Sequence, residues 1–263
     1  QCDRLGAMSR LDDLHDLTGK VAVVTGGSRG IGRAIVQVFA EHGADVVIAS
    51  RKLDNCQAVA AEATASTGRR ALGVGYHAGK WADADALFER VLDEFGRIDV
   101  LVNNAGMSPL YESLGAVTEE MYDKTLAVNL KGPFRLSALA GEWMVAHDGG
   151  SIINVGTAGS LMASPNELPY AAAKAGLNAL TAGFADAWAA HGVRVNAILP
   201  GPFRTSLSEA WAPPPGEEVA FSPMRRLGEP DEIAPLALHL ASRASSYTTG
   251  AIIRVDGGIT RRV

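Results

Sequence analysis

Short apolar runs rich in valine, isoleucine and leucine alternate with longer amphipathic segments along almost the whole chain. The apolar runs are typical of strands buried on both faces, and the segments between them have helical spacing. Parallel strands need helical crossovers, so the alternation predicts one doubly wound α/β domain: a seven-stranded parallel sheet with helices on both faces. Strands are expected at residues 21–25, 45–49, 71–76, 100–103, 151–155, 194–199 and 251–255, and six helices, one between Ile31 and Gly43 and the others at residues 54–66, 83–95, 119–146, 170–191 and 231–241.

The length of 263 residues fits one domain rather than two, because the seven strands and their crossovers occupy most of it. Residues 1–16 read as a polar N-terminal extension, and residues 17–263 as the single domain. The longest stretch without a regular period is residues 202–223, and loops of this length usually bind or cover a ligand. We therefore expect a lid at about residues 202–223.

The composition of the chain excludes several classes of protein and of binding partner. Hydrophobic residues make up 47% and charged residues 20% of the chain, which is typical of a globular protein and excludes intrinsic disorder. The formal net charge of -5 argues against a nucleic-acid partner. No apolar run reaches the roughly 20 residues of a membrane span, so no membrane partner is expected. Cys2 and Cys56 suggest neither a disulfide framework nor a zinc site, and we expect a reducing, cytoplasmic location.

A glycine-rich turn follows the first expected strand and precedes the first helix. Glycine permits a tight turn and lets the backbone approach a phosphate, and a helix N-terminus offers unpaired N–H groups to an anion. Ligands of parallel α/β sheets bind at this carboxyl edge. The turn, with Gly26, Arg29, Gly30 and Gly32, therefore predicts a dinucleotide phosphate site, although a turn of this kind can also serve folding alone.

The end of the second expected strand indicates which dinucleotide the site prefers. A site for NAD(H) usually carries Asp or Glu about 20 residues beyond the glycines, where it accepts from the adenosine ribose. This chain has Ser50, Arg51 and Lys52 there instead. The guanidinium groups of Arg29 and Arg51 suit a 2′-phosphate, so NADP(H) is expected in preference to NAD(H). The alternative is that these residues are solvated surface cations.

Tyr170 and Lys174 are four residues apart at the start of an alanine-rich expected helix, so both project from one face of it. A free tyrosine is a poor acid–base group near neutral pH because its pKa is about 10. A neighbouring ammonium group favours the phenolate. The pair predicts an acid–base centre at Tyr170, although this spacing by itself mostly occurs by chance.

Six segments resemble, in the same order, those of the short-chain dehydrogenase/reductase family, and in particular its 3-oxoacyl-(acyl-carrier-protein) reductase-like members. They are residues 25–32, 103–106, 128–130, 170–174, 200–201 and 255–258. The resemblance implies a single Rossmann-type domain, NAD(P)(H) as cosubstrate, reversible oxidoreduction between an alcohol and a carbonyl, and a homo-oligomer, either tetramer or dimer. It also implies that the helices at residues 119–146 and 170–191 lie at subunit interfaces.

The resemblance assigns roles residue by residue. Tyr170 is the expected proton donor to the carbonyl oxygen. Lys174 is expected to bind the nicotinamide ribose and to lower the pKa of Tyr170. Asn129 is expected to hold a water molecule that relays protons. Considered alone, Asn129 reads equally well as a polar residue in a bent helix. The resemblance also implies which residues bind the cofactor. Besides the glycines and cations above, and Tyr170 and Lys174, they are Ser28, Ile31, Ser50, Asn104, Ala105, Gly106, Val128, Pro200, Gly201 and Thr205.

The chain departs from the family pattern at two positions. Thr157 stands where the family has its catalytic serine, thirteen positions before the tyrosine, and its hydroxyl can perform the same hydrogen bonding with a stiffer side chain. Ser160 is the rival donor. After the third expected strand, Ala78 replaces the acidic residue often found near the adenine amine, so that contact falls to backbone or to His77.

The substrate is the least constrained part of the prediction. The expected pocket walls at residues 107–111, 161–169 and 203–221 are largely apolar, and they include Met107, Leu110, Met162, Leu168, Trp211 and Phe221. They suit a 3-oxoacyl thioester, a steroid, a quinone or a hydrophobic alcohol without ranking them. We expect the 3-oxoacyl thioester, with the others and a sugar as alternatives. No metal is required, because no histidine pair has metal-ligand spacing. A nucleotide-binding module without turnover is the alternative that is not an enzyme. A methyltransferase is disfavoured because it has no need of the Tyr/Lys pair, and an epimerase because it usually carries a larger substrate domain for which no length is left.

Overall fold

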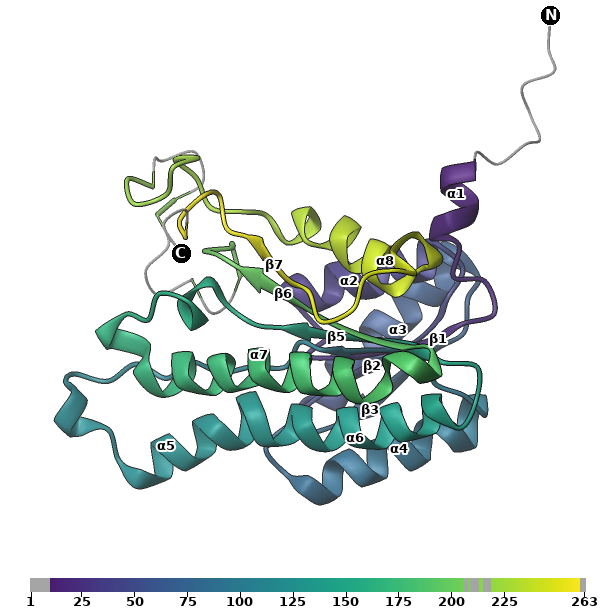
Figure 1. Cartoon of the computed structure of the whole chain (residues 1–263), viewed down its shortest axis with the longest axis horizontal. Coiled ribbons are helices and arrows are strands. Elements are labelled where there is room, and N and C mark those ends of the chain that lie inside the picture. The colour runs from purple at the N-terminus through teal and green to yellow at the C-terminus, as the bar shows by residue number, and fades with distance from the viewer. Residues whose placement is uncertain (1–9, 206–207, 209–212, 215–218, 261–263) are drawn as a thin grey trace, which may run out of the picture.

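The computed structural model describes residues 10–205, 208, 213–214 and 219–260, and one parallel β-sheet forms its centre (Figure 1). The spatial order of the strands is β3-β2-β1-β4-β5-β6-β7, so the order reverses direction between β1 and β4. Ligands of such sheets bind at the carboxyl ends of the strands beside this reversal. The predicted doubly wound fold is confirmed. Its strands are β1 Val21–Thr25, β2 Asp45–Ser50, β3 Ala71–Gly75, β4 Val100–Asn103, β5 Gly150–Val155, β6 Val193–Pro200 and β7 Ile252–Val255.

Helices cover both faces of the sheet (Figure 1). On one face α2, α3 and α8 pack against the sheet, and α2 buries Ile35 and Phe39 there. On the other face α4, α6 and α7 pack, with Leu136 and Met144 of α6 in the core. Strand residues alternate between these two cores, which explains why the strands are apolar on both sides. The helices are α1 Arg10–His15, α2 Gly30–Glu41, α3 Leu53–Thr67, α4 Trp81–Phe95, α5 Glu119–Leu126, α6 Gly132–Val145, α7 Leu168–Trp188 and α8 Ala234–Ala241.

The single helix predicted at residues 119–146 is divided into α5 and α6 by a π-helical turn, Ala127–Lys131. The cause is local, because Pro133 has no N–H to donate to the carbonyl of Asn129, as a regular α-helix requires. The N–H of Gly132 instead reaches the carbonyl oxygen of Ala127, five residues back. Such π-turns often occur at functional sites, and this one carries Asn129.

The short helix α1 lies in the segment whose polar pattern predicts no element. Tertiary contacts hold it against α8 and the turn that follows α8. The Arg243 guanidinium donates to the carbonyl oxygen of Asp13 at 2.9 Å, and the His15 ring lies 5.9 Å from that of His239. A helix this short is not stable alone, so its sequence pattern carries little signal.

A buried carboxylate joins β1 and β4 at the edge of the sheet opposite the carboxyl ends. Asp99 is 7% exposed and accepts from the Val21 N–H at 2.9 Å, from the Arg97 Nε at 2.8 Å and from the Lys20 ammonium at 3.1 Å. Burial alone raises the pKa of Asp99, but the hydrogen bonds from Arg97, Val21 and Lys20 outweigh burial and hold it below its usual value. A carboxyl whose pKa is lowered by folding stabilises the folded state at neutral pH.

Asp99→Asn should lower the free energy of unfolding at neutral pH by about 1–3 kcal/mol, since buried donors lose a charged acceptor. The contribution of the carboxylate is present above its unfolded pKa of 3.8 and is lost as the pH falls through the lower folded value. Urea unfolding near pH 7 and near pH 3 should therefore show a gap between wild type and variant that shrinks in acid. The exposed Asp93→Asn serves as control, and a gap that stays constant with pH would contradict the assignment.

Candidate active site

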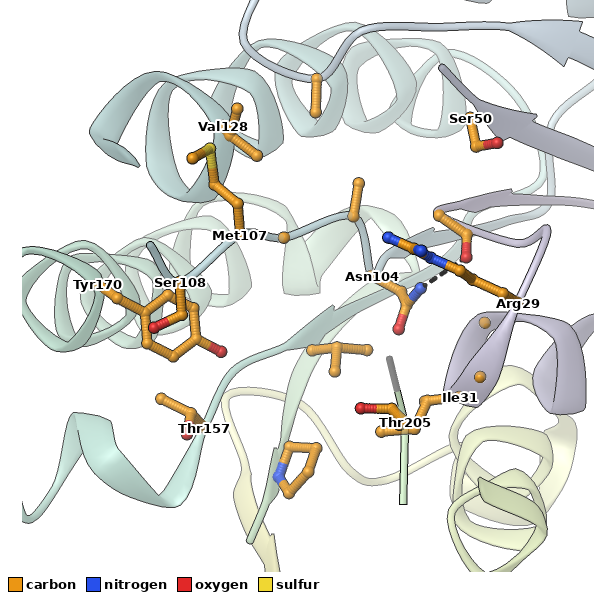
Figure 2. Close-up of a pocket in the computed structure, with 18 of the residues that line it drawn as sticks. Arg29, Ile31, Ser50, Asn104, Met107, Ser108, Val128, Thr157, Tyr170 and Thr205 are labelled. Atoms are coloured by element: carbon orange, nitrogen blue, oxygen red, sulfur yellow. Dashed lines mark hydrogen bonds between the residues drawn. The ribbon is translucent and has the colours of Figure 1, made fainter. Parts of the chain in front are cut away.

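A cavity of about 380 Å³ lies at the carboxyl ends of the strands, where the strand order reverses (Figure 2). Three of the four predicted catalytic residues line it: Thr157, Tyr170 and Lys174. Asn129 does not. Every residue predicted to bind the cofactor also lines it: Gly26, Ser28, Arg29, Gly30, Ile31, Gly32, Ser50, Arg51, Asn104, Ala105, Gly106, Val128, Tyr170, Lys174, Pro200, Gly201 and Thr205.

The glycine turn needs glycine at three positions for two different reasons. Gly26 and Gly30 have φ of 67° and 51°, in the left-handed region that other residues rarely adopt. At Gly32 a Cβ would overlap the carbonyl oxygen of Gly26, so any side chain would push α2 away from the turn. The N-terminus of α2 therefore sits against the cavity with its unpaired N–H groups available to an anion.

A hydrogen-bonded clasp joins this turn to the end of β4. The Thr25 hydroxyl accepts from the backbone N–H groups of Asn104 at 3.0 Å and Ala105 at 3.1 Å. The Asn104 amide group donates in return to the carbonyl oxygens of Thr25 at 2.9 Å and Gly26 at 3.2 Å. The side chain of Asn104 thus shapes the cavity by holding its floor, and the backbone of the segment faces the ligand space.

Charge around the cavity is strongly one-sided. Arg29, Arg51, Lys52, Lys124 and Lys174 line it, whereas none of the described residues that line it is acidic. The chain as a whole carries a net charge of -5, so this wall is a local concentration of positive charge. Such a wall attracts a polyanionic ligand and lacks the carboxylate that a free ribose 2′-hydroxyl would need.

Two serine hydroxyls accompany the arginines at this end. Ser28 Oγ lies 2.8 Å from Ser50 Oγ, and Ser50 Oγ lies 3.0 Å from the buried Cys56 Sγ. Ser28 belongs to the glycine turn and Ser50 ends β2, so the contact ties the two loops together. Figure 2 shows Arg29 and Ser50 on one side of the cavity and Tyr170 and Thr157 on the other.

Tyr170 and Lys174 lie at the opposite end, on the first turns of α7. The Lys174 ammonium is buried, donates to the Val155 carbonyl oxygen at 2.7 Å and lies 5.9 Å from the centre of the Tyr170 ring. Burial lowers the pKa of Lys174 to about 8. At neutral pH the group is therefore still mainly charged, and it places a positive charge beneath the site.

The surrounding protein raises the pKa of the Tyr170 phenol above its usual value. Burial contributes most and the charge of Glu167 adds to it, while a hydrogen bond with Thr157 acts in the opposite direction. The phenol is therefore protonated at neutral pH, which is the form that donates a proton. The lowering of this pKa by Lys174 that the family resemblance implies stays a prediction.

The two rival hydroxyls are placed differently. Thr157 lines the cavity, and its Oγ1 accepts from the Gly159 N–H at 3.2 Å, which leaves its own hydrogen for another acceptor. The Ser160 hydroxyl is committed elsewhere, because it donates to the Thr157 carbonyl oxygen at 2.6 Å and accepts from the Asn178 amide at 2.9 Å. The geometry favours Thr157 as the hydrogen-bond donor to a ligand in the cavity.

Asn129 lies behind the cavity wall and is fully buried. Its amide group donates to the carbonyl oxygens of Met107 at 2.8 Å and Thr125 at 2.9 Å, and its Oδ1 accepts from the Met107 N–H at 3.2 Å. The side chain therefore fixes the chain direction at Met107 immediately after the clasp. Its predicted contact with a relay water stays a prediction.

The segment after β3 also reaches the cavity. Tyr76, His77 and Ala78 line it. The Nδ1 of His77 accepts from the Gly79 N–H at 3.1 Å, and the His77 N–H donates to Asp83 at 3.0 Å, so this histidine is held within its own loop. None of the three residues of this segment that line the cavity is acidic, in agreement with the departure from the family pattern at Ala78.

Sequence reasoning missed two polar residues of the wall, Asn55 and Lys124. Lys124 stands four residues before Val128, and Asn55 four after Arg51. Lys124 therefore lies one helical turn before a predicted residue, whereas Asn55 lies in the first turn of α3 and Arg51 precedes that helix. The four-residue spacing from a predicted residue was the sequence signal that could have identified Lys124.

The predicted apolar walls are only partly brought together. Met107 and Leu110 line the cavity, whereas Met162, Leu168 and Phe221 do not and are exposed. The loops instead bind each other: the Tyr111 hydroxyl donates to the Pro165 carbonyl oxygen at 2.6 Å and accepts from the Leu168 N–H at 2.9 Å. Trp211 and much of the predicted lid lie outside the described residues.

Two structural findings concern metals and membranes. Among the residues that the structure describes, no group of three or more His, Cys, Asp or Glu side chains is arranged to hold a metal ion. Within the same part of the chain, every helix is too short or too polar to cross a membrane.

A family model, related sequences and solved structures all indicate the same family. A family model described as "Enoyl-(Acyl carrier protein) reductase" matches residues 26–260. The 3-oxoacyl-[acyl-carrier-protein] reductase of Thermotoga maritima is 37% identical over 248 residues, which cover 92% of this chain and 98% of that protein. The NAD-dependent glycerol dehydrogenase of Listeria innocua is 37% identical over 251 residues, covering 95% and 97%.

A solved relative has the same fold over its full length. The gluconate 5-dehydrogenase of Burkholderia cenocepacia, in complex with NADP and tartrate, matches with a TM-score of 0.90 at 32% identity, covering 97% of this chain and 100% of that one. These relatives differ in the substrate that their names give. The human dehydrogenase/reductase SDR family member 4 is 37% identical over 261 residues, covering 98% of this chain and 93% of that protein. The chain belongs to the short-chain dehydrogenase/reductase family and is an oxidoreductase of that family, which binds a nicotinamide cofactor.

Proposed function

We propose that this enzyme uses NADP(H) to interconvert a carbonyl and a secondary alcohol. One observation carries the proposal: a phenol, a hydroxyl and a buried ammonium group lie on the wall of the same cavity as a glycine turn and four further cations. The residues present fit the cofactor, because the turn and the N-terminus of α2 suit a pyrophosphate and Lys174 suits a ribose.

The nicotinamide ring, when bound, supplies or accepts the hydride. The side chains of the protein supply the proton, the hydrogen bonds and the positive charge. Tyr170 donates its proton to the carbonyl oxygen, and Thr157 donates a hydrogen bond to the same oxygen as negative charge develops on it. Lys174 binds the nicotinamide ribose and favours the phenolate that remains after proton transfer, because its positive charge lies beneath the Tyr170 ring.

The raised pKa of Tyr170 keeps the phenol protonated at neutral pH, which is the form that donates a proton in reduction. Oxidation of an alcohol uses the phenolate, and its fraction grows as the pH rises. Asn129 acts in this scheme by holding the Met107 backbone at the cavity wall, and we propose that it also holds the relay water.

We propose NADP(H) rather than NAD(H) because of the charges around Arg51. The described wall has no carboxylate to bind a free 2′-hydroxyl, and Arg29 and Arg51 can bind a 2′-phosphate in bidentate fashion. The gluconate 5-dehydrogenase relative contains NADP, whereas the glycerol dehydrogenase relative is NAD-dependent by name, so family membership alone does not decide the preference.

The favoured substrate class is a 3-oxoacyl thioester. The similarity to the Thermotoga maritima reductase supports it, as do Met107 and Leu110 on the cavity wall. A polyol or sugar acid is the second candidate, because the glycerol and gluconate dehydrogenases match this chain over nearly its whole length. A screen of NADPH oxidation over 3-oxo esters, quinones and keto-sugars separates the two, and NADPH binding without any turnover would support a nucleotide-binding module instead.

We also propose a homo-oligomer, a dimer or a tetramer, assembled through α5, α6 and α7. An apolar groove of about 740 Å³ between these helices supports it, with Leu126, Leu130, Phe134 and Leu180 in its lining. Phe134 is 38% exposed beside these leucines, and a contiguous exposed apolar patch often marks an interaction site.

Tyr170→Phe should abolish carbonyl reduction, because the ring remains but the proton donor is lost. NADPH binding, followed by quenching of tryptophan fluorescence, should stay within about two-fold, since the phosphates and adenosine bind elsewhere. Reduction that continues at the wild-type rate would reject the mechanism.

Wild-type enzyme should bind NADPH more tightly than NADH in a fluorescence titration. Arg51→Ala should remove most of that difference by weakening NADPH binding alone, on the order of 10-fold for the loss of one charge-assisted contact. Lys20→Ala, far from the cavity, is the matched control. Tighter binding of NADH by the wild type would refute the cofactor preference.

Thr157→Ala should reduce kcat on the order of 10²-fold, the usual cost of losing one donor to a developing oxyanion. Ser160→Ala should lose much less, because the Ser160 hydroxyl is bound to the Thr157 carbonyl and does not line the cavity. Steady-state kinetics of both variants test the assignment. The reverse order of losses would transfer the role to Ser160.

A further inference from the structure

A chain of hydrogen bonds runs behind Thr157, from α7 to the backbone of the substrate loop. The Asn178 amide group donates to Ser160 Oγ at 2.9 Å, and Ser160 Oγ donates to the Thr157 carbonyl oxygen at 2.6 Å. A serine hydroxyl can accept and donate at once, so Ser160 acts as the link. Neither Asn178 nor Ser160 lines the cavity.

Asn178 lies one helical turn beyond Lys174 on α7. Lys174 binds the carbonyl oxygen of Val155, and Asn178 through Ser160 binds that of Thr157, two residues further on. The helix that carries Tyr170 is therefore bound to the last residue of β5 through the Val155 carbonyl and, through Ser160, to the loop after β5 at the Thr157 carbonyl. These contacts fix the distance between the Tyr170 side chain and the Thr157 backbone.

The asparagine comes at a cost to stability. Asn178 is 8% exposed, and its Oδ1 is buried with no hydrogen-bond partner among the described residues. A buried acceptor without a partner destabilises the fold, and a leucine of similar size would remove that penalty. Stability therefore gives no reason for an asparagine here, and the remaining contact of the side chain is the one to Ser160.

We propose that Asn178 is a positioning residue that acts through Ser160 to keep the hydroxyl of Thr157 facing the substrate oxygen. The orientation of that hydroxyl depends on the backbone at Thr157, because Oγ1 is also tied to the Gly159 N–H at 3.2 Å. A small rotation of the Thr157 peptide would misdirect the hydrogen. The inference rests on the role proposed above for Thr157.

Asn178→Leu should lower kcat roughly 10-fold, since misplacement of a catalytic group by about 1 Å can cost up to 10²-fold. The substrates used are ethyl acetoacetate and phenanthrenequinone with NADPH, and the rate is measured on whichever the wild type reduces faster. The Kd for NADPH should stay within about two-fold because the cofactor wall is untouched. The melting temperature should be equal to or above that of the wild type. A fall in kcat without a fall in stability separates positioning from a merely structural role.

The double variant Asn178→Leu with Thr157→Ala supplies the decisive comparison. If Asn178 acts only through Thr157, the double variant should be no slower than Thr157→Ala alone, because there is no hydroxyl left to orient. Losses that multiply, or an unchanged kcat in Asn178→Leu, would overturn the inference.

Thr181→Val is the matched control on the same helix. Thr181 is fully buried and accepts from Asn154 at 2.9 Å, so its loss should lower stability and leave kcat unchanged. An equal fall in kcat in the control would show general loosening of α7 and overturn the proposal. The single variant Thr157→Ala separates failure of the proposed catalytic role of Thr157 from failure of the positioning role of Asn178. If Thr157→Ala keeps full activity, the role of Thr157 is wrong, and the positioning role of Asn178 is wrong with it.

Discussion

The clasp between Thr25 and Asn104 is the interaction on which the cavity depends. At the reversal of strand order, the loops after β1 and β4 leave toward opposite faces of the sheet and a gap opens between them. The Asn104 amide crosses that gap to the carbonyl oxygens of Thr25 and Gly26. It satisfies buried backbone groups and at the same time sets how far the glycine turn stands from the end of β4. The positions of the glycine turn and of Met107 follow from it.

The two ends of the cavity use positive charge differently. At one end Arg29 and Arg51 are accessible, and they can bind a phosphate with little loss of solvation. At the other end Lys174 is buried, its pKa is lowered to about 8, and its charge acts on the phenol beside it. One wall thus combines binding of an anion with control of a proton, while the chain as a whole remains acidic.

Much of this site could be read from the sequence because its parts are local. The glycine turn, the cations after β2 and the Tyr170/Lys174 pair are each defined by short spacing within one element and its loop. Asn129 is the instructive exception. Its residue type and motif were recognisable, but its direction depends on the π-turn before Pro133, which points it at Met107 and not into the cavity. The substrate walls were the weakest prediction, since they depend on how two loops pack against each other through Tyr111.

The sequence by itself determined the alternation of strands and helices, the single domain, the dinucleotide edge and most of the residues that face it. The alternation and the edge follow from periodicity and from glycine conformation, which are properties of a few neighbouring residues, whereas most of the facing residues are implied by the resemblance to the family. Only the tertiary structure decided which hydroxyl faces the cavity, because the Ser160 hydroxyl donates to the Thr157 carbonyl oxygen while Thr157 lines the cavity beside Tyr170. It also decided that α1 forms and that Lys124 reaches the cavity. The contacts that hold α1 and that bring Lys124 to the cavity wall join residues distant in sequence, and no local pattern encodes them.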